Sequence, residues 1–135
     1  MNQIQIKNLI EEHAETIRKL HARVHETFIS REKSSDKRNE WQRACEEFHK
    51  RYPQLAFIGG YDGALERILA GDPHTIEVAF CFLECRPYFF RSGYMYKDIY
   101  RKLKCAPLND VQSKRLTTIV SLYTAWRATK NKRHA

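Results

Sequence analysis

Glycine and proline are scarce in this sequence of 135 residues, which contains five glycines and four prolines. Their scarcity argues against long loops and low-complexity linkers. Sustained alternation of polar and apolar residues, which predicts β-strands, is missing as well. A chain of this length fits one domain, and one hydrophobic core can stabilise it without a metal ion or disulfide bonds. We therefore expect a single helical domain over residues 1–135.

Long apolar segments are also missing. The longest apolar run, 76–83, is interrupted by Glu77 and is shorter than the roughly 18 residues of a membrane-spanning helix. The N-terminal segment has no basic stretch followed by an apolar one and no small-residue cleavage site, so we expect no secretory signal. These absences favour a cytoplasmic protein that does not enter a membrane.

Cysteine and histidine do not form a metal-binding pattern. The cysteines, at 45, 81, 85 and 105, are expected to be buried free thiols, since a chain without an export signal stays in a reducing compartment. Cys81 and Cys85 share one helix face, but two further zinc ligands at short spacing are lacking. His21 and His25 have zinc-like helical spacing, yet Ala22 stands where a metalloprotease needs glutamate. We expect no metal and no cofactor.

The spacing of apolar residues predicts an all-α bundle of about six helices. Two long helices, about 3–31 and a second that ends at Tyr52 before Pro53, should form an antiparallel hairpin over 3–52, with Ser35 or Asp36 as the second N-cap. Four shorter helices should follow within 60–130: one that stops at Gly71, then 73–85, 92–105 and about 110–130. Residues 131–135 are expected to be a frayed tail. A short α-solenoid is the second choice, because no clean internal repeat is present.

Two of these helices carry specific expectations. Helix 73–85 is apolar on nearly every side and is preceded by Asp72, a good N-cap, so it should be the central buried helix. In helix 110–130 the residues expected to face inward are Val111, Leu116, Ile119, Val120, Tyr123 and Trp126.

Charge is distributed very unevenly. Residues 1–57 carry 11 Lys/Arg and 9 Asp/Glu, residues 58–85 carry 1 and 5, and residues 86–135 carry 12 and 2. The formal net charge of +8 therefore arises in the last fifty residues. A surface of one sign attracts partners of the other.

The most regular part of this basic region is a stripe on the expected helix 92–105. Lys97, Arg101 and Lys104 are spaced by four and three residues, and Tyr96 and Tyr100 lie beside them. Arg91 adds a charge nearby. Tyrosine beside arginine or lysine suits a protein interface, and the same pairing suits a nucleic acid, whose phosphates and bases it can contact. An ordinary solvated helix face is the third interpretation.

Several strings along the chain resemble a family of small, uncharacterised bacterial helical proteins. They are GGYDGALERILAGDP, FLE, FFRSGY and KLKCAPL, preceded by Trp41, Cys45, Phe48 and Tyr52, and together they cover about 39–108. Some small proteins of this general type lie beside polymorphic toxins as immunity proteins. The resemblance implies a helical fold and a toxin-neutralising role, and it carries no catalytic residue to this chain.

Our first functional hypothesis is a non-enzymatic protein that binds an acidic protein partner through Arg91, Tyr96, Lys97, Tyr100, Arg101 and Lys104. A toxin neutralised by an immunity protein is one form of it. Nucleic-acid binding by the same face is the alternative. The oligomeric state stays open.

A helical RNase of the HEPN type is a third hypothesis. Such enzymes place a histidine four to six residues after an arginine, so that the arginine orients the phosphate and the histidine transfers a proton. Arg43 with His49, and Arg127 with His134, come near this spacing. A chain with this many arginines and histidines should contain about two such pairs by chance. Glycines 59, 60 and 63 do not form a phosphate-binding loop, because no strand precedes them.

Overall fold

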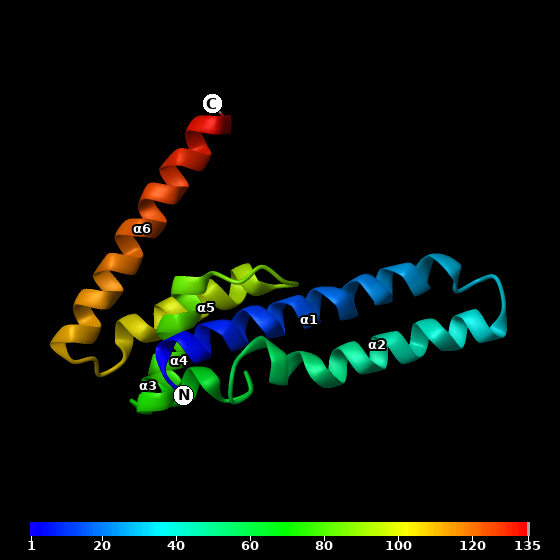
Figure 1. The fold of residues 1–135 in the computed structure, drawn as a ribbon, viewed down its shortest axis with the longest axis horizontal. Helices are drawn as coiled ribbons and strands as arrows, with labels where there is room; N and C mark the ends of the chain where they lie inside the picture. Colours follow the sequence, from blue (N-terminus) through cyan, green and yellow to red (C-terminus); the bar gives the residue numbers. More distant parts are fainter. Residues whose placement is uncertain (135) are drawn as a thin grey trace.

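Six helices make up the fold in the computed structural model, which describes the backbone of residues 1–134 and the side chains of 1–130 (Figure 1). No strand occurs in that part of the chain. The helices are α1 (Gln3–Ser30), α2 (Ser35–Ala56), α3 (Ala64–Leu69), α4 (Pro73–Cys85), α5 (Ser92–Cys105) and α6 (Asp110–His134). The expected all-α fold is confirmed, and the bounds of α4 and α5 are those expected from the sequence.

The α1–α2 hairpin is antiparallel, and both of its helices are capped at the N-terminus (Figure 1). The Asn2 side chain accepts a hydrogen bond from the Gln5 amide, and the Gln5 side chain accepts one from the Asn2 amide, both at 2.9 Å. At α2 the N-cap is Ser34, which accepts from the Lys37 amide at 3.1 Å. The expected caps, Ser35 and Asp36, instead lie in the first turn of the helix.

The expected end of α2 at Tyr52 is wrong, because the helix continues through Pro53 to Ala56. Proline in a helix interior removes one backbone hydrogen bond and strains the preceding turn. Here Leu55 packs against the core, and Ala56 and the following Phe57 are buried in it. Burial of that turn offsets the lost bond. The Pro53 carbonyl is also satisfied, since it accepts from the Tyr61 amide at 2.9 Å.

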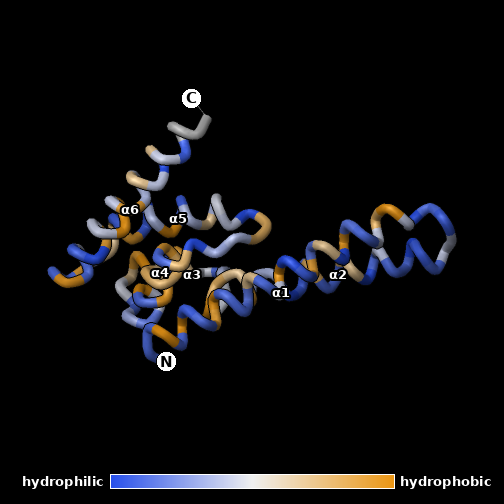
Figure 2. The backbone as a smooth tube through the Cα atoms, turned by 45° about the horizontal axis from the view of Figure 1, so that its top comes forward, coloured by the Kyte–Doolittle hydropathy of each residue, from blue (hydrophilic) through white to orange (hydrophobic). Residues whose placement is uncertain are grey.

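Helix α4 is the centre of the core, as expected. It is buried continuously from Val78 to Leu83 and packs against α1, α3 and α5. Asp72 caps it by accepting from the Thr75 amide at 2.9 Å. Figure 2 shows the hydrophobic stretches gathered around α3 and α4, whereas the far half of the hairpin is largely hydrophilic.

Gly71 ends α3 in the left-handed region, with φ of 84°. A Cβ atom at this position would lie 2.8 Å from Cγ of Pro107, in the connection between α5 and α6. Glycine is therefore required twice over here, by the backbone conformation and by the close approach of that connection.

The four cysteines are free thiols, but only Cys81 is buried, and Cys105 is exposed. The expectation that all four would be buried is therefore wrong. Cys105 is the last residue of α5 and lies two positions after the buried Leu103, which places it on the opposite side of the helix. Burial, together with the nearby Glu77 carboxylate, raises the pKa of Cys81 to about 11, so this thiol stays protonated.

Helix α6 begins against the core and then projects away from it (Figure 1). Leu116 and Ile119 are buried, and Val120 and Tyr123 are half-buried, as expected. Val111 is 75% exposed and Trp126 is 47% exposed, so these two do not join the core. None of the inward residues lies three or four positions from Val111, which places it on another side of the helix.

Helix α6 also continues beyond the expected end at residue 130, and its backbone is helical to His134. The frayed tail was expected at 131–135. The side chains of these residues, and the whole of Ala135, lie outside the described part of the chain. None of the described helices is both long enough and apolar enough to cross a membrane.

Arg115 attaches α6 to the core through two carboxylates of α4. Its guanidinium lies 2.7 Å from a Glu77 oxygen and 2.5 Å from a Glu84 oxygen, with a further Nε bond of 3.2 Å to Glu84. Lys7 of α1 lies 3.3 Å from Glu84 and extends the network to the hairpin. Two acidic residues of the middle segment thus serve as ion-pair partners for the basic region.

The network also determines the ionisation of its members. Burial raises the pKa of Glu77 and of Glu84, but hydrogen bonds and charge from Arg115 outweigh it and bring both pKa values below the ordinary value of 4.5. Burial lowers the pKa of Arg115, and the two carboxylates more than reverse this, so the net shift is upward. All three groups are therefore charged at neutral pH.

Replacing Arg115 with methionine is expected to lower the free energy of unfolding at neutral pH by about 2 kcal/mol, because two half-buried carboxylates lose charge-assisted hydrogen bonds. A depressed carboxylate pKa contributes stability above its unfolded-state value and loses it as pH falls. The wild type should therefore lose more stability than the variant between about pH 5 and pH 3. Urea unfolding followed by circular dichroism measures both effects. Lys114→Met, an exposed neighbour, is the control. Equal stability of the Arg115 variant and the wild type would contradict a role for this network.

Candidate functional site

The six residues of the predicted binding surface lie together where α5 faces α6. Arg91 is the N-cap of α5, and the other five belong to that helix. Lys97, Arg101 and Lys104 are exposed, whereas Tyr96 and Tyr100 are half-buried and pack on the core. Each of the six lines one of two neighbouring grooves. We call the surface formed by both grooves the α5–α6 face.

The smaller groove has a volume of about 360 Å³ and runs between the two helices. Its α5 wall contains five of the expected residues: Tyr96, Lys97, Tyr100, Arg101 and Lys104. The α6 wall is Ile119, Val120, Tyr123 and Thr124. The Lys104 ammonium lies 4.7 Å from the centre of the Tyr100 ring, within cation–π distance. The groove therefore has an apolar floor and a basic rim.

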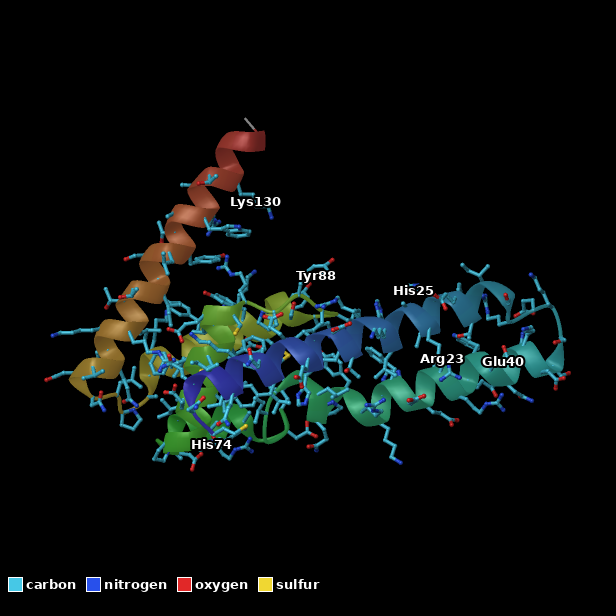
Figure 3. All side chains as sticks on the ribbon, in the orientation of Figure 1. Arg23, His25, Glu40, His74, Tyr88 and Lys130 are labelled. Carbon is cyan, nitrogen blue, oxygen red and sulfur yellow. The ribbon has the colours of Figure 1, made fainter. Side chains whose placement is uncertain are left out.

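The larger groove, of about 860 Å³, continues from the smaller one and was not anticipated. The two share Tyr96, Lys97 and Tyr123. Loop 86–91 and the start of α5 form one wall, and Trp126 and Lys130 of α6 form the facing wall. In Figure 3, Tyr88 projects from the loop toward the angle between α5 and α6, and Lys130 lies on the side of α6 that faces the rest of the molecule.

The lining of the larger groove contains five cationic residues and no aspartate or glutamate. The cations are Arg18, Arg86, Arg91, Lys97 and Lys130. Several aromatic rings stand among them, of which Tyr88 is 80% exposed and Tyr94 is 71% exposed. A concave surface with these properties favours an anionic ligand that also offers apolar surface.

Arg86 lies between the two walls and contacts three rings. Its guanidinium carbon is 4.8 Å from the ring centre of Tyr96, 4.5 Å from that of Tyr123 and 4.4 Å from that of Trp126. The rings also stack on one another, Tyr96 with Tyr123 at 5.6 Å and Tyr123 with Trp126 at 6.0 Å. Cation–π contacts of this kind contribute about 0.5–1 kcal/mol each where exposed. Arg86 and its rings thus connect the outer half of α6 to loop 86–91.

Both ends of loop 86–91 are arginines in the left-handed region. Arg86 has φ of 48° and Arg91 has φ of 67°, and they are the non-glycine residues with positive φ in the described chain. This conformation costs a residue with a Cβ roughly 1–2 kcal/mol. The loop nevertheless places both arginines in the larger groove. Strain of this kind tends to gather where a side chain must point in a particular direction.

Contacts on both sides of the loop maintain this conformation. The Tyr52 hydroxyl donates to the Phe90 carbonyl at 2.7 Å, and Arg18 donates to the Tyr88 carbonyl at 2.8 Å. Burial and the nearby Tyr61, opposed in part by Arg91, together raise the pKa of Tyr52 to about 12. The hydroxyl therefore remains a donor. These contacts hold the loop backbone while the side chains of Arg86, Tyr88 and Arg91 line the groove.

Histidine 21 closes the α1 end of the larger groove. Its ring stacks on Phe90 with a centre-to-centre distance of 4.8 Å and meets the ring of His25 edge-on at 4.6 Å. Burial lowers the pKa of His21, and the neighbouring His25 lowers it further, so the ring is neutral at pH 7. Within the described part of the chain, no three side chains of His, Cys, Asp or Glu gather as metal ligands.

The residues of the RNase hypothesis lie elsewhere. Arg43 and His49 are exposed on α2, and neither lines either groove. Arg127 is exposed on α6 and also lines neither groove, and the His134 side chain lies outside the described residues. No substrate-binding cleft therefore accompanies the Arg43–His49 pair among the two grooves.

Sequence reasoning missed Arg86, Tyr88, Tyr94, Trp126 and Lys130. Trp126 and Tyr123 were assigned to the core from helical periodicity, which does not distinguish a side chain that meets the core from one that meets a loop. One usable signal was present: the residue before a proline is disfavoured in the right-handed helical region, so Arg86 has to leave the helix before Pro87.

Replacing Arg91 with glycine is expected to raise the free energy of unfolding by about 1 kcal/mol, because it relieves the left-handed strain and removes one of several like charges. Lys50→Gly, an exposed site inside α2, is the matched control and should lower it by about 1 kcal/mol. Urea unfolding measures both variants. A destabilised Arg91→Gly protein would mean that the arginine side chain contributes more to folding than its backbone strain costs.

Comparison with protein-family models, with curated proteins and with solved structures gave no match for this chain. The resemblance to small bacterial helical proteins of toxin-immunity type therefore stays a prediction.

Proposed function

We propose that this chain is a non-enzymatic binding protein whose α5–α6 face engages an acidic protein partner. The observation that carries the proposal is the pair of contiguous grooves with cationic rims and no carboxylate in the larger lining. A toxin covered and neutralised by its immunity protein is one concrete form. The four free thiols are compatible with a reducing compartment, and we place the encounter in the cytoplasm.

The distribution of ion pairs supports this choice of surface. Most cations of the hairpin are neutralised within the chain, as in the pairs Lys19–Glu15, Arg23–Glu47 and Arg51–Glu47. On the α5–α6 face, the described residues show one weak pair, Arg101–Asp98 at 3.9 Å. Unneutralised charge on one face accelerates encounter with a partner of opposite sign and disfavours basic competitors.

Aromatic residues add apolar contact area to this charge. Tyrosine, tryptophan and arginine are the residues that most often dominate the binding energy of protein interfaces. The α5–α6 face presents all three types within one continuous surface, with Tyr88 and Tyr94 strongly exposed. A partner that carries acidic residues around an apolar patch would match both properties.

The double variant Lys97→Glu with Arg101→Glu is expected to abolish co-purification of the partner from the native host, because two attractive contacts become repulsive. Both residues are exposed, so helicity in circular dichroism should be unchanged. Lys33→Glu with Lys50→Glu on the hairpin makes the same change in net charge and should bind normally. Equal loss of partner binding in both double variants would show that net charge alone matters. Undiminished binding by the Lys97→Glu, Arg101→Glu variant would show that the interface lies elsewhere.

Single-stranded nucleic acid is the second candidate ligand. The observation that favours it is the exposure of the Tyr88 and Tyr94 rings beside Arg91 and Lys97, since such rings can stack bases while the cations contact phosphates.

Salt dependence separates these candidates. Binding of a single-stranded oligonucleotide that uses several phosphate contacts should weaken by orders of magnitude between about 50 and 200 mM salt. The measurement is fluorescence anisotropy of a labelled oligonucleotide, and Tyr94→Ala should weaken binding if the ring stacks a base. An affinity that is insensitive to salt, or no binding at low salt, would eliminate nucleic acid as the ligand.

A further inference from the structure

Arg86 differs from the other cations of the face because its guanidinium contacts three aromatic rings. The rings of Tyr96, Tyr123 and Trp126 lie within 4.4–4.8 Å of the guanidinium carbon. Its backbone is held in the left-handed region at the end of α4. Among the described residues, no hydrogen bond or ion pair uses its five N–H donors. The protein therefore positions this side chain, and the described residues leave its hydrogen-bond donors unused.

A guanidinium that is stacked on rings keeps its donors free in one direction. The three rings lie beside the guanidinium, and its N–H groups point outward in the guanidinium plane. A carboxylate can approach that edge and accept two parallel hydrogen bonds. The lining of the larger groove has no acid of its own to compete for them.

Base stacking is disfavoured at the same place. Tyr96, Tyr123 and Trp126 already stack on one another and on Arg86. A nucleobase would have to displace one of these contacts, whereas a carboxylate at the guanidinium edge would leave all of them in place. The local geometry therefore favours an anionic group at the guanidinium edge over a stacked base.

We propose that Arg86 is the anchor of the partner-binding face, and that its guanidinium receives an aspartate or glutamate carboxylate from an acidic segment of the partner lying in the larger groove. The inference rests on the proposed function and adds the chemistry of the contact to it. Arg91 and Lys97 line the same groove and meet neighbouring acidic side chains of the segment. Because the Arg86 guanidinium also contacts the rings of α6, the bound carboxylate and the outer half of α6 share one anchor.

The test uses Trp126 as a reporter inside the groove. The chain has two tryptophans, and the other, Trp41, lies near Phe28 in the hairpin. In a Trp41→Phe background, the emission of Trp126 and its quenching by acrylamide report directly on the larger groove. Poly-L-glutamate is the probe, poly-L-glutamine is the uncharged control, and oligo-dT is the nucleic-acid comparison. Poly-L-glutamate is expected to protect Trp126 from acrylamide.

The deciding variant is Arg86→Lys, which keeps a cation beside the rings but loses the planar fork. Its affinity for poly-L-glutamate is expected to fall by about tenfold or more, the effect of losing a bidentate charge-assisted contact. Arg127→Lys is the matched control, since it makes the same exchange on α6 outside both grooves, and it should bind within about twofold of the wild type.

A purely structural role of Arg86 is tested separately. Tyr123→Leu removes one ring from the stack and loosens α6 but keeps the Arg86 guanidinium itself. If Arg86 is the anchor, Arg86→Lys weakens binding more than Tyr123→Leu does, even where both shift the Trp126 emission equally. Equal weakening in the two variants would assign Arg86 to the support of α6 and overturn the inference.

The remaining outcomes separate this inference from the proposed function. If Arg86→Lys binds like the wild type while Lys97→Glu with Arg101→Glu does not bind, the proposed function stands and the anchor is wrong. If the wild type fails to bind poly-L-glutamate, the inference is wrong, and the co-purification experiment still decides the proposed function. Displacement of poly-L-glutamate by oligo-dT at moderate salt would also overturn the inference in favour of nucleic acid.

Discussion

The candidate site depends on the attachment of Arg115 to Glu77 and Glu84. This contact joins the first part of α6 to the central helix α4, and Leu116 and Ile119 pack beside it. If the first part of α6 were not held against α4, α6 would not face α5, and neither groove would form. The ion pairs are partly shielded from water, since the Arg115 side chain is only 18% exposed. They are therefore less screened by salt than a surface pair.

The charge of the basic region is divided between two tasks. Arg115 stabilises the fold, because its guanidinium donates hydrogen bonds to the Glu77 and Glu84 carboxylates of α4. The cations of the α5–α6 face are left without such partners, apart from the weak Arg101–Asp98 pair among the described residues. A count of positive residues along the sequence cannot separate these tasks, because the separation depends on which side chains meet across helices.

Most of the fold followed from local signals in the sequence. The bounds of α4 and α5 were predictable because Asp72–Pro73 starts one helix and apolar periodicity with a following proline delimits the other. The end of α2 was not, because the burial of Ala56 and Phe57 is a tertiary effect that overrides the local preference of Pro53. The five α5 residues of the site followed from helical spacing alone. Arg86 and Trp126 did not, since their contact joins segments forty residues apart in the chain.

The projection of α6 has a mechanical consequence. The helix has two supports, the Arg115 network near its start and the Arg86 ring stack near Trp126. At a rise of 1.5 Å per residue these supports are about 17 Å apart, and about 12 Å of helix extends beyond the second. With both supports in place, the orientation of α6 relative to the core is fixed at two points. With only the Arg115 network in place, a small rotation of α6 at its N-terminal end becomes a large displacement at its C-terminal end. The width of the groove then depends on the angle between α6 and the core and not on the packing of the groove walls.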